Sequence, residues 1–147
     1  MSDALRLSAA QLDSIFRHSY ACKPEEACGV LAGDRDGNVK YVYLMENVRH
    51  STTRYDMGKR ELFDVFDEIW NKGLELVAIF HSHPHSPAIP SDVDLNLAIP
   101  EPGIVLHPES FYLIISLMDD EPVCNAFKID DEEFVEAEIC IGEVRNA

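Results

Sequence analysis

The stretch His81-Ser-His-Pro-His-Ser-Pro-Ala-Ile-Pro-Ser-Asp-Val-Asp94 decides how the rest of this sequence is interpreted. It directly follows Leu74 to Phe80, an almost continuous apolar run that is typical of a strand buried on both faces. In an extended chain, residues two apart point to the same side, so His81 and His83 project together. Two imidazoles placed in this way can share one tetrahedral zinc ion. By itself, however, an H-x-H pair is more often accidental than metal-binding.

Ser91 and Asp94 form an S-x-x-D pattern before an apolar segment. This is the pattern of a helix capping box, which has no catalytic meaning of its own. A capping box also places Asp94 in the first helical turn, with its carboxylate directed back toward the end of the preceding strand. Two histidines and one carboxylate leave a fourth zinc position free for water, which distinguishes catalytic sites from closed structural ones. Such a site still needs a carboxylate base that is not a ligand.

The spacing of apolar residues and turn signals predicts the elements around this stretch. It predicts three helices, over Ser8–Tyr20, Arg60–Asn71 and Ser91–Ala98. It predicts six strands, over Cys28–Gly33, Val39–Met45, Leu74–Phe80, Phe111–Leu117, Pro122–Ile129 and Phe134–Ile141. Three prolines and a glycine make Ile99–Ser110 a loop, and its place after the third helix suggests a flap over a bound substrate.

One motif resembles the signature of the JAMM (MPN-type) metallopeptidases. It consists of His81-Ser-His-Pro84, six intervening residues, Ser91, two more residues, and then Asp94. That family has an upstream E-x-C-G-x-L-x-G segment that begins a strand. The segment Glu26-Ala-Cys-Gly-Val-Leu-Ala-Gly33 is similar to it throughout, and Thr53-Arg-Tyr-Asp-Met57 resembles a segment of small bacterial and archaeal members. Either motif alone is moderate evidence, whereas the two together and in this order are strong evidence.

The resemblance extends from Leu5 to about Ile129 and implies a fold. That fold is α/β, a mixed, curved β-sheet flanked by helices in a cytidine-deaminase-like sandwich, and we expect residues 1–147 to form one such domain. One departure is Gly58-Lys59, where related sequences often have an acidic residue and a proline. It affects the start of a helix rather than the zinc site.

Carried over residue by residue, the resemblance implies roles for five side chains. His81, His83 and Asp94 would bind one Zn²⁺ per chain. Glu26 would be the general base that takes a proton from the zinc-bound water and passes it to the leaving amine. Ser91 would hydrogen-bond that water or the developing oxyanion.

Several residues have competing interpretations. Glu25 could be the base in place of Glu26, but we expect it to face solvent. His85 shares the side-chain parity of His81 and could replace Asp94 as a ligand, but we expect it on the rim of the site. Cys28 could be a nucleophile, although a small buried thiol is more probable. We expect His18, His50 and His107 on the surface, and Trp70 in the core.

Composition narrows the set of partners. The 147 residues carry 12 basic and 27 acidic side chains, a net charge of −15, which repels phosphate backbones and anionic lipid. We therefore expect no nucleic-acid or membrane partner. No apolar run is long enough to span a bilayer, and the first residues have no apolar core like that of a signal peptide. The four cysteines show no C-x-x-C spacing and are expected to be reduced, so we expect a cytoplasmic location.

Three functions compete as explanations of these motifs. The first is a zinc-dependent peptidase or isopeptidase. The JAMM resemblance implies a substrate with an extended carboxy-terminal tail, as in ubiquitin-like and sulfur-carrier proteins. The second is a non-catalytic interaction module on the same fold, which the complete ligand set argues against. The third is a nucleoside-type zinc deaminase, but this chain lacks the required H-x-E and P-C-x-x-C motifs.

Overall fold

The computed structural model describes residues 3–142. Within this range the chain forms three helices, α1 (Ala9–Cys22), α2 (Lys59–Asn71) and α3 (Asp92–Ala98). It also forms seven strands, β1 (Ala4–Leu7), β2 (Cys28–Gly33), β3 (Val39–Met45), β4 (Glu75–His83), β5 (Phe111–Ser116), β6 (Val123–Asp130) and β7 (Glu133–Ile141). All three predicted helices and all six predicted strands are present, and no end differs from the prediction by more than three residues.

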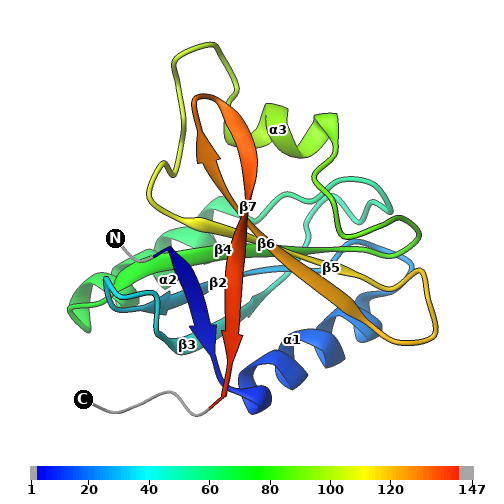
Figure 1. Ribbon diagram of the computed structural model, residues 1–147, viewed down its shortest axis with the longest axis horizontal. Helices are drawn as coiled ribbons and strands as arrows, with labels where there is room; N and C mark the ends of the chain where they lie inside the picture. Colours follow the sequence, from blue (N-terminus) through cyan, green and yellow to red (C-terminus); the bar gives the residue numbers. More distant parts are fainter. Residues whose placement is uncertain (1–2, 143–147) are drawn as a thin grey trace.

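The strands form one mixed sheet in the order β1-β7-β6-β5-β4-β2-β3. β1 pairs with β7 and β4 pairs with β5 in parallel, whereas the other pairs are antiparallel. The sheet curls until its two ends meet, because the backbone N–H of Arg6 in β1 donates to the carbonyl of Gly37 in the β2–β3 turn at 2.8 Å. β1 and β7 therefore cross in front of β2 and β4 in Figure 1, and the sheet is nearly a barrel.

Each face of the sheet packs its own apolar core. Leu12 and Ile15 of α1 bury against Leu31, Phe80 and Leu113 on the concave face. On the other face, residues of α2 and α3 pack against side chains of β2, β4 and β5. Figure 1 shows α1 and α3 on opposite sides of the sheet. This curved α/β arrangement is the predicted fold class.

β4 ends three residues later than predicted, at His83, and this matters for the site. His81 pairs with Cys28 of β2 on one side and Ile114 of β5 on the other, and His83 pairs with Ser116. The histidines therefore lie inside the strand rather than after it. The strand continues because both neighbours supply hydrogen-bond partners, which apolar periodicity does not register.

Sequence reasoning missed β1 and misplaced Trp70. β1 has only four residues and is held by its pairing with β7, so it has no period long enough to detect. Trp70 was expected in the core but is 81% exposed. The inward side of α2 contains Ile69, and the next residue is turned by about 100° around the helix axis, toward solvent.

Two of the histidines expected on the surface are half-buried. The Nε2 of His18 lies 3.2 Å from the carbonyl oxygen of Met45, because α1 packs directly on the sheet. His107 lies beside the ring of Phe66. His50 is exposed, as expected. All four cysteines are free thiols, and Cys28 is buried.

Candidate metal centre

Three side chains meet at the carboxyl end of β4. The Nε2 atoms of His81 and His83 lie 3.1 Å apart. The carboxylate of Asp94 reaches both rings, with Oδ1 at 3.1 Å from His81 Nε2 and Oδ2 at 3.0 Å from His83 Nε2. All three side chains are buried, with 2 to 6% of each residue exposed. No other three His, Cys, Asp or Glu residues within residues 3–142 bring ligand atoms this close together.

The dimensions of this cluster fit a zinc ion. In a tetrahedral site with bonds of 2.0–2.1 Å, ligand atoms are separated by roughly 3.3–3.4 Å. The Nε2 atoms of His81 and His83, 3.1 Å apart, are close to one edge of such a tetrahedron, and Asp94 presents Oδ1 to the first ring at 3.1 Å and Oδ2 to the second at 3.0 Å. One ligand atom from each of the three residues lies within 4.8 Å of the other two. Two imidazole nitrogens and one carboxylate oxygen are also a common donor set for catalytic zinc.

The two imidazole rings are oriented by different contacts. His83 Nδ1 lies 2.7 Å from the carbonyl oxygen of Pro87. Because a carbonyl oxygen only accepts hydrogen bonds, Nδ1 must carry the hydrogen. In the neutral ring, the lone pair is then on Nε2, which faces the cluster. His81 Nδ1 is buried without a hydrogen-bond partner. Its ring instead stacks on the ring of Tyr55, with centroids 4.7 Å apart and planes 22° apart.

Asp94 is oriented by the predicted capping box. Ser91 is the N-cap of α3, and its Oγ accepts from the backbone N–H of Asp94 at 3.1 Å. In return, the N–H of Ser91 donates to Asp94 Oδ2 at 2.9 Å. The cap therefore fixes the carboxylate that faces the two histidines, while Ser91 itself remains exposed.

The cluster shifts the pKa of each of its members. Burial alone would raise the pKa of Asp94, but the hydrogen bonds with His81 and His83 hold it well below its usual value. Burial lowers the pKa of His81. For His83, burial acts in the same direction, but the bonds to Asp94 and to the Pro87 carbonyl outweigh it and raise the pKa. The carboxylate therefore stays ionised and available to a cation.

Glu26 lies beside this cluster, two residues before the start of the neighbouring strand β2. The β2–β4 ladder pairs Cys28 with His81, and the N–H of Ser82 donates to the Ala27 carbonyl, so Glu26 falls opposite His83. It is 4% exposed, and its Oε1 is buried without a hydrogen-bond partner. Burial raises the pKa of Glu26 to about 8, although the charge of His83 lowers it and that of Asp94 raises it. A carboxyl group with such a pKa can both take up and release a proton near neutral pH.

The competing candidates lie elsewhere. Glu25 is turned away and its Oε1 pairs with His50 Nδ1 at 3.0 Å, outside the cluster. His85 is exposed and is not part of the cluster. Burial raises the pKa of the Cys28 thiol to about 12, which disfavours the thiolate that a nucleophile needs.

Two residues near the centre received no role from the sequence. One is Tyr55, which was part of a quoted resemblance but carried no function. The other is Asn47, a buried residue whose side chain bonds the backbone of Glu26. An asparagine just after a strand usually indicates a turn, so no local pattern distinguishes it.

Comparison with known proteins agrees with this geometry. Residues 8–130 match the family of prokaryotic homologs of the JAB domain. The chain belongs to this JAB/MPN family. The match covers most of the chain and includes Glu26 and the whole His81–Asp94 stretch.

Named JAB-family relatives are peptidases. The chain is 35% identical to a desampylase of Haloferax volcanii over 103 residues, which cover 66% of this chain and 74% of that protein. It is 29% identical to the CysO-cysteine peptidase of Mycobacterium tuberculosis over 116 residues, which cover 78% of this chain and 75% of that protein. A solution structure of a protein from Desulfitobacterium hafniense is similar, with a TM-score of 0.81, 35% identity, and coverage of 95% of this chain and 93% of that one.

These findings confirm the JAMM/MPN resemblance, the fold class and the enzyme class of JAMM-type peptidase. No helix in residues 3–142 is long and apolar enough to cross a membrane.

Proposed function

We propose that this JAB-family protein is a zinc-dependent peptidase or isopeptidase that cleaves the bond at the carboxy-terminal tail of a ubiquitin-like or sulfur-carrier protein. The observation that carries the proposal is the convergence of His81, His83 and Asp94 beside the buried carboxyl group of Glu26. The names of the relatives, a desampylase and a CysO-cysteine peptidase, support the substrate class. The four free thiols suit a reducing compartment, and we place the reaction in the cytoplasm.

His81, His83 and Asp94 would hold one Zn²⁺ per chain. When bound, zinc supplies Lewis-acid chemistry, because it polarises a carbonyl group and lowers the pKa of a water molecule toward about 7. The remaining functions fall to side chains of the protein.

Glu26 moves the proton in the proposed reaction. Its unpartnered Oε1 accepts a proton from the attacking water and then delivers that proton to the leaving amine nitrogen. A pKa that burial raises toward neutral suits both steps, because the group must gain the proton and then release it. A cation held by the neighbouring ligands would lower this pKa and keep the base ionised.

Ser91 assists at the carbonyl oxygen. Its Oγ already accepts from the N–H of Asp94, which leaves the hydroxyl hydrogen free to donate. A donor directed at the oxygen on which negative charge develops stabilises the transition state more than the ground state.

Metal analysis and cleavage assays test this proposal together. The purified protein should contain one zinc per chain and should cleave a carrier-protein fusion at the end of its tail. The combined His81→Ala, His83→Ala variant should lose both the metal and the activity. His85→Ala, a histidine change in the same stretch but on an exposed side chain, should retain both. Stoichiometric zinc in the double variant would overturn the ligand assignment.

A further inference from the structure

Asn47 uses its side chain to join separate parts of the centre. It lies two residues after the end of β3 and is only 6% exposed. Its Nδ2 donates to the carbonyl of Glu26 at 3.0 Å and to the carbonyl of Arg54 at 2.9 Å. Its Oδ1 accepts from the backbone N–H groups of Arg49 and Asp56, each at 3.1 Å. All four hydrogen-bonding positions of this amide are therefore used.

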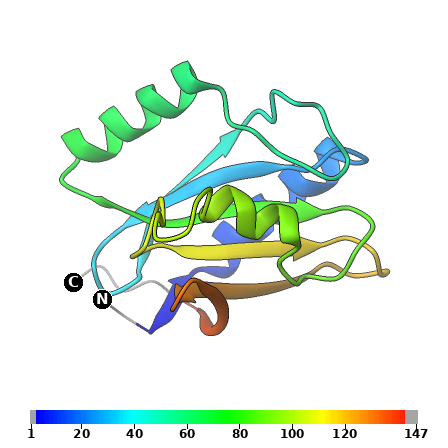
Figure 2. The same cartoon turned by 90° about the horizontal axis from the view of Figure 1, so that it is seen from above.

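Two of these contacts lie on either side of Tyr55. Arg54 and Asp56 are its immediate neighbours in the chain, so the amide of Asn47 fixes the backbone just before and just after this tyrosine. A further backbone bond, from Val48 to the carbonyl of Asp56 at 2.9 Å, closes the loop. Figure 2 shows this β3–α2 loop beside the end of β4.

Tyr55 stacks on the ligand ring whose second nitrogen has no partner. Nδ1 of His83 is held by the carbonyl of Pro87, but Nδ1 of His81 has no hydrogen-bond partner. The Nε2 of His81 faces Asp94 Oδ1 at 3.1 Å, and the stacked ring of Tyr55 adds a second restraint on rotation of His81 about its side-chain bonds.

We infer that Asn47 is a positioning residue that fixes the backbone of Glu26 relative to the backbone around Tyr55. Tyr55 in turn orients His81 toward the metal. One buried amide therefore couples the proton-transferring residue to a metal-binding histidine, although it touches neither functional group directly. The inference rests on the proposed function for the role of Glu26, but its effect on metal binding can be measured without any substrate.

Asn47→Asp and Asn71→Asp form a matched pair of variants. The first change removes the two Nδ2 donors and leaves the acceptor in place, whereas Asn71 is an exposed residue of α2 whose side chain donates to Asp67. Zinc affinity is measured by competition with a chelator. Support of this kind typically changes metal affinity by roughly 10–100-fold, so Asn47→Asp should weaken zinc binding by that factor and Asn71→Asp should not. Unchanged affinity in a folded Asn47→Asp variant would overturn the inference.

Tyr55→Leu and Tyr55→Phe test the second step independently, including the case in which Asn47→Asp does not fold. Leucine removes the aromatic ring, whereas phenylalanine retains it. Zinc affinity should fall in Tyr55→Leu and be restored in Tyr55→Phe. Hydrogen exchange in residues 48–57 should rise in the Asn47 variant but not in the Tyr55 variants. Equal zinc affinity of the leucine and phenylalanine proteins would exclude the stacking role.

The same loop carries a second, independent feature, which is its charge. Residues 49–60 contain four of the twelve Lys and Arg residues of the chain but only one of its twenty-seven Asp and Glu residues. Arg49, Arg54, Lys59 and Arg60 are all exposed. Arg60 pairs with Asp64, whereas the other three form no ion pair within the described part of the chain.

The geometry points to residues 49–60 as a docking surface for an acidic segment of the protein substrate. This inference rests on the proposed function. The segment adjoins the centre through Tyr55, so a protein whose tail reaches His81 must pass close to it. The net charge of −15 would repel an acidic partner at long range. At physiological salt, however, charges act over a Debye length of about 8 Å, so the local positive charge decides what binds here.

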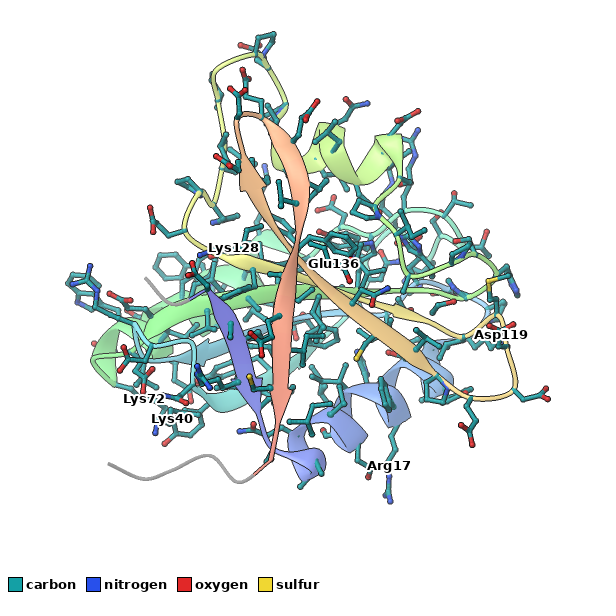
Figure 3. All side chains as sticks on the ribbon, viewed as in Figure 1. Arg17, Lys40, Lys72, Asp119, Lys128 and Glu136 are labelled. Atoms are coloured by element: carbon teal, nitrogen blue, oxygen red, sulfur yellow. The ribbon has the colours of Figure 1, made fainter. Side chains whose placement is uncertain are left out.

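Two fluorescent peptides that end in Gly-Gly test this surface, one with an acidic upstream segment and one with a neutral segment. Binding is measured by anisotropy, and cleavage of the same peptides as amides reports the proposed function separately. Arg49→Glu with Arg54→Glu should weaken binding of the acidic peptide roughly tenfold at physiological salt and leave the neutral peptide unaffected. The control is Arg17→Glu with Arg35→Glu, an equal change in charge. Figure 3 shows Arg17 pointing into solvent from α1, which packs on the other face of the sheet.

The outcomes separate the two proposals. Loss of acidic-peptide binding in the loop variant alone supports the docking surface, whether or not the peptides are cleaved. Equal binding of the acidic and neutral peptides, or equal loss in both double variants, overturns it. Absence of cleavage with selective binding intact would instead count against the proposed function.

Discussion

The two faces of the sheet are built on different principles. The face under α1 is a core of Leu, Ile, Val, Phe and Ala side chains. The face under α2 and α3 also has an apolar core, but His81, His83, Asp94 and Glu26 are buried within it. Every buried side-chain polar atom without a partner in residues 3–142 belongs to this second face; these atoms are on Glu26, Tyr43, His81 and Tyr112.

This difference separates stability from chemistry. Apolar burial is favourable and needs no partner, so the α1 face can be packed for stability alone. Buried polar groups without partners are unfavourable and persist where they serve a function. The stability of the α1 face therefore offsets the cost of burying these polar groups on the second face.

The largest expected effect is on turnover, at the second face. Glu26→Gln should lower turnover by roughly 10²–10⁴-fold, because the amide cannot accept the proton. Zinc content should be unchanged, because Glu26 is not among the three clustered ligands. Steady-state kinetics and metal analysis of the same preparation check this. Near-normal turnover would assign the base to another group, with Glu25 the first to examine.

The next effect is on stability, at the first face. Ile15 of α1 is fully buried, and Ile15→Ala should reduce the free energy of unfolding by about 2–5 kcal/mol. Turnover and zinc content per folded molecule should not change. Urea denaturation measures the first quantity, and assays well below the denaturation midpoint measure the others. A folded Ile15→Ala protein with reduced turnover would show that the faces are not independent.

Ser91 tests whether one residue serves both roles. Asparagine caps a helix as well as serine does, so Ser91→Asn should keep the stability that an alanine variant loses, about 0.5–2 kcal/mol. If the hydroxyl also stabilises the oxyanion, Ser91→Asn should lower turnover roughly 10²–10³-fold. We expect a folded, zinc-loaded and nearly inactive protein. Full activity would reduce Ser91 to a helix cap.

Glu26 should also make the metal-free protein pH-sensitive. Its folded pKa is about 8, whereas the pKa in the unfolded chain is near the ordinary value of 4.5. Between these values the unfolded chain releases a proton that the folded protein keeps, so stability falls as the pH rises from about 4.5 to about 8. The contribution of Glu26 at pH 7 is a loss of roughly 2–3 kcal/mol. Thermal unfolding of metal-free protein at pH 5 and pH 8 should show this slope, and Glu26→Gln should reduce it.

The smallest expected effect concerns residues 99–110, which we expect to order over a bound tail. Hydrogen exchange in this loop should slow when a ubiquitin-like tail is bound to Glu26→Gln protein, while exchange in α1 stays constant. Equal protection with and without the tail would contradict a flap.

The sequence by itself determined every described helix and strand except β1, and it also determined the candidate chemistry. The two-residue spacing of His81 and His83 in a strand gives them a common face, and the capping box between Ser91 and Asp94 depends only on local backbone geometry. Both features involve residues that are close in the chain, so the order of residues is enough to predict them. The E-x-C-G segment and the family resemblance identified Glu26 as a candidate site residue. Its position beside the cluster could not be predicted from the spacing of residues in the sequence.

Tertiary structure alone decided how these groups are supported. Asn47 is 21 residues from Glu26 and Tyr55 is 26 residues from His81, yet each pair is in contact. The pairing of β1 with β7 and the exposure of Trp70 likewise depend on which surfaces meet. A hydrogen bond or a stacked ring between distant residues produces no periodic pattern in the sequence. Its energy depends on the distance between groups that come together only when the sheet has curled and the β3–α2 loop lies against the end of β4.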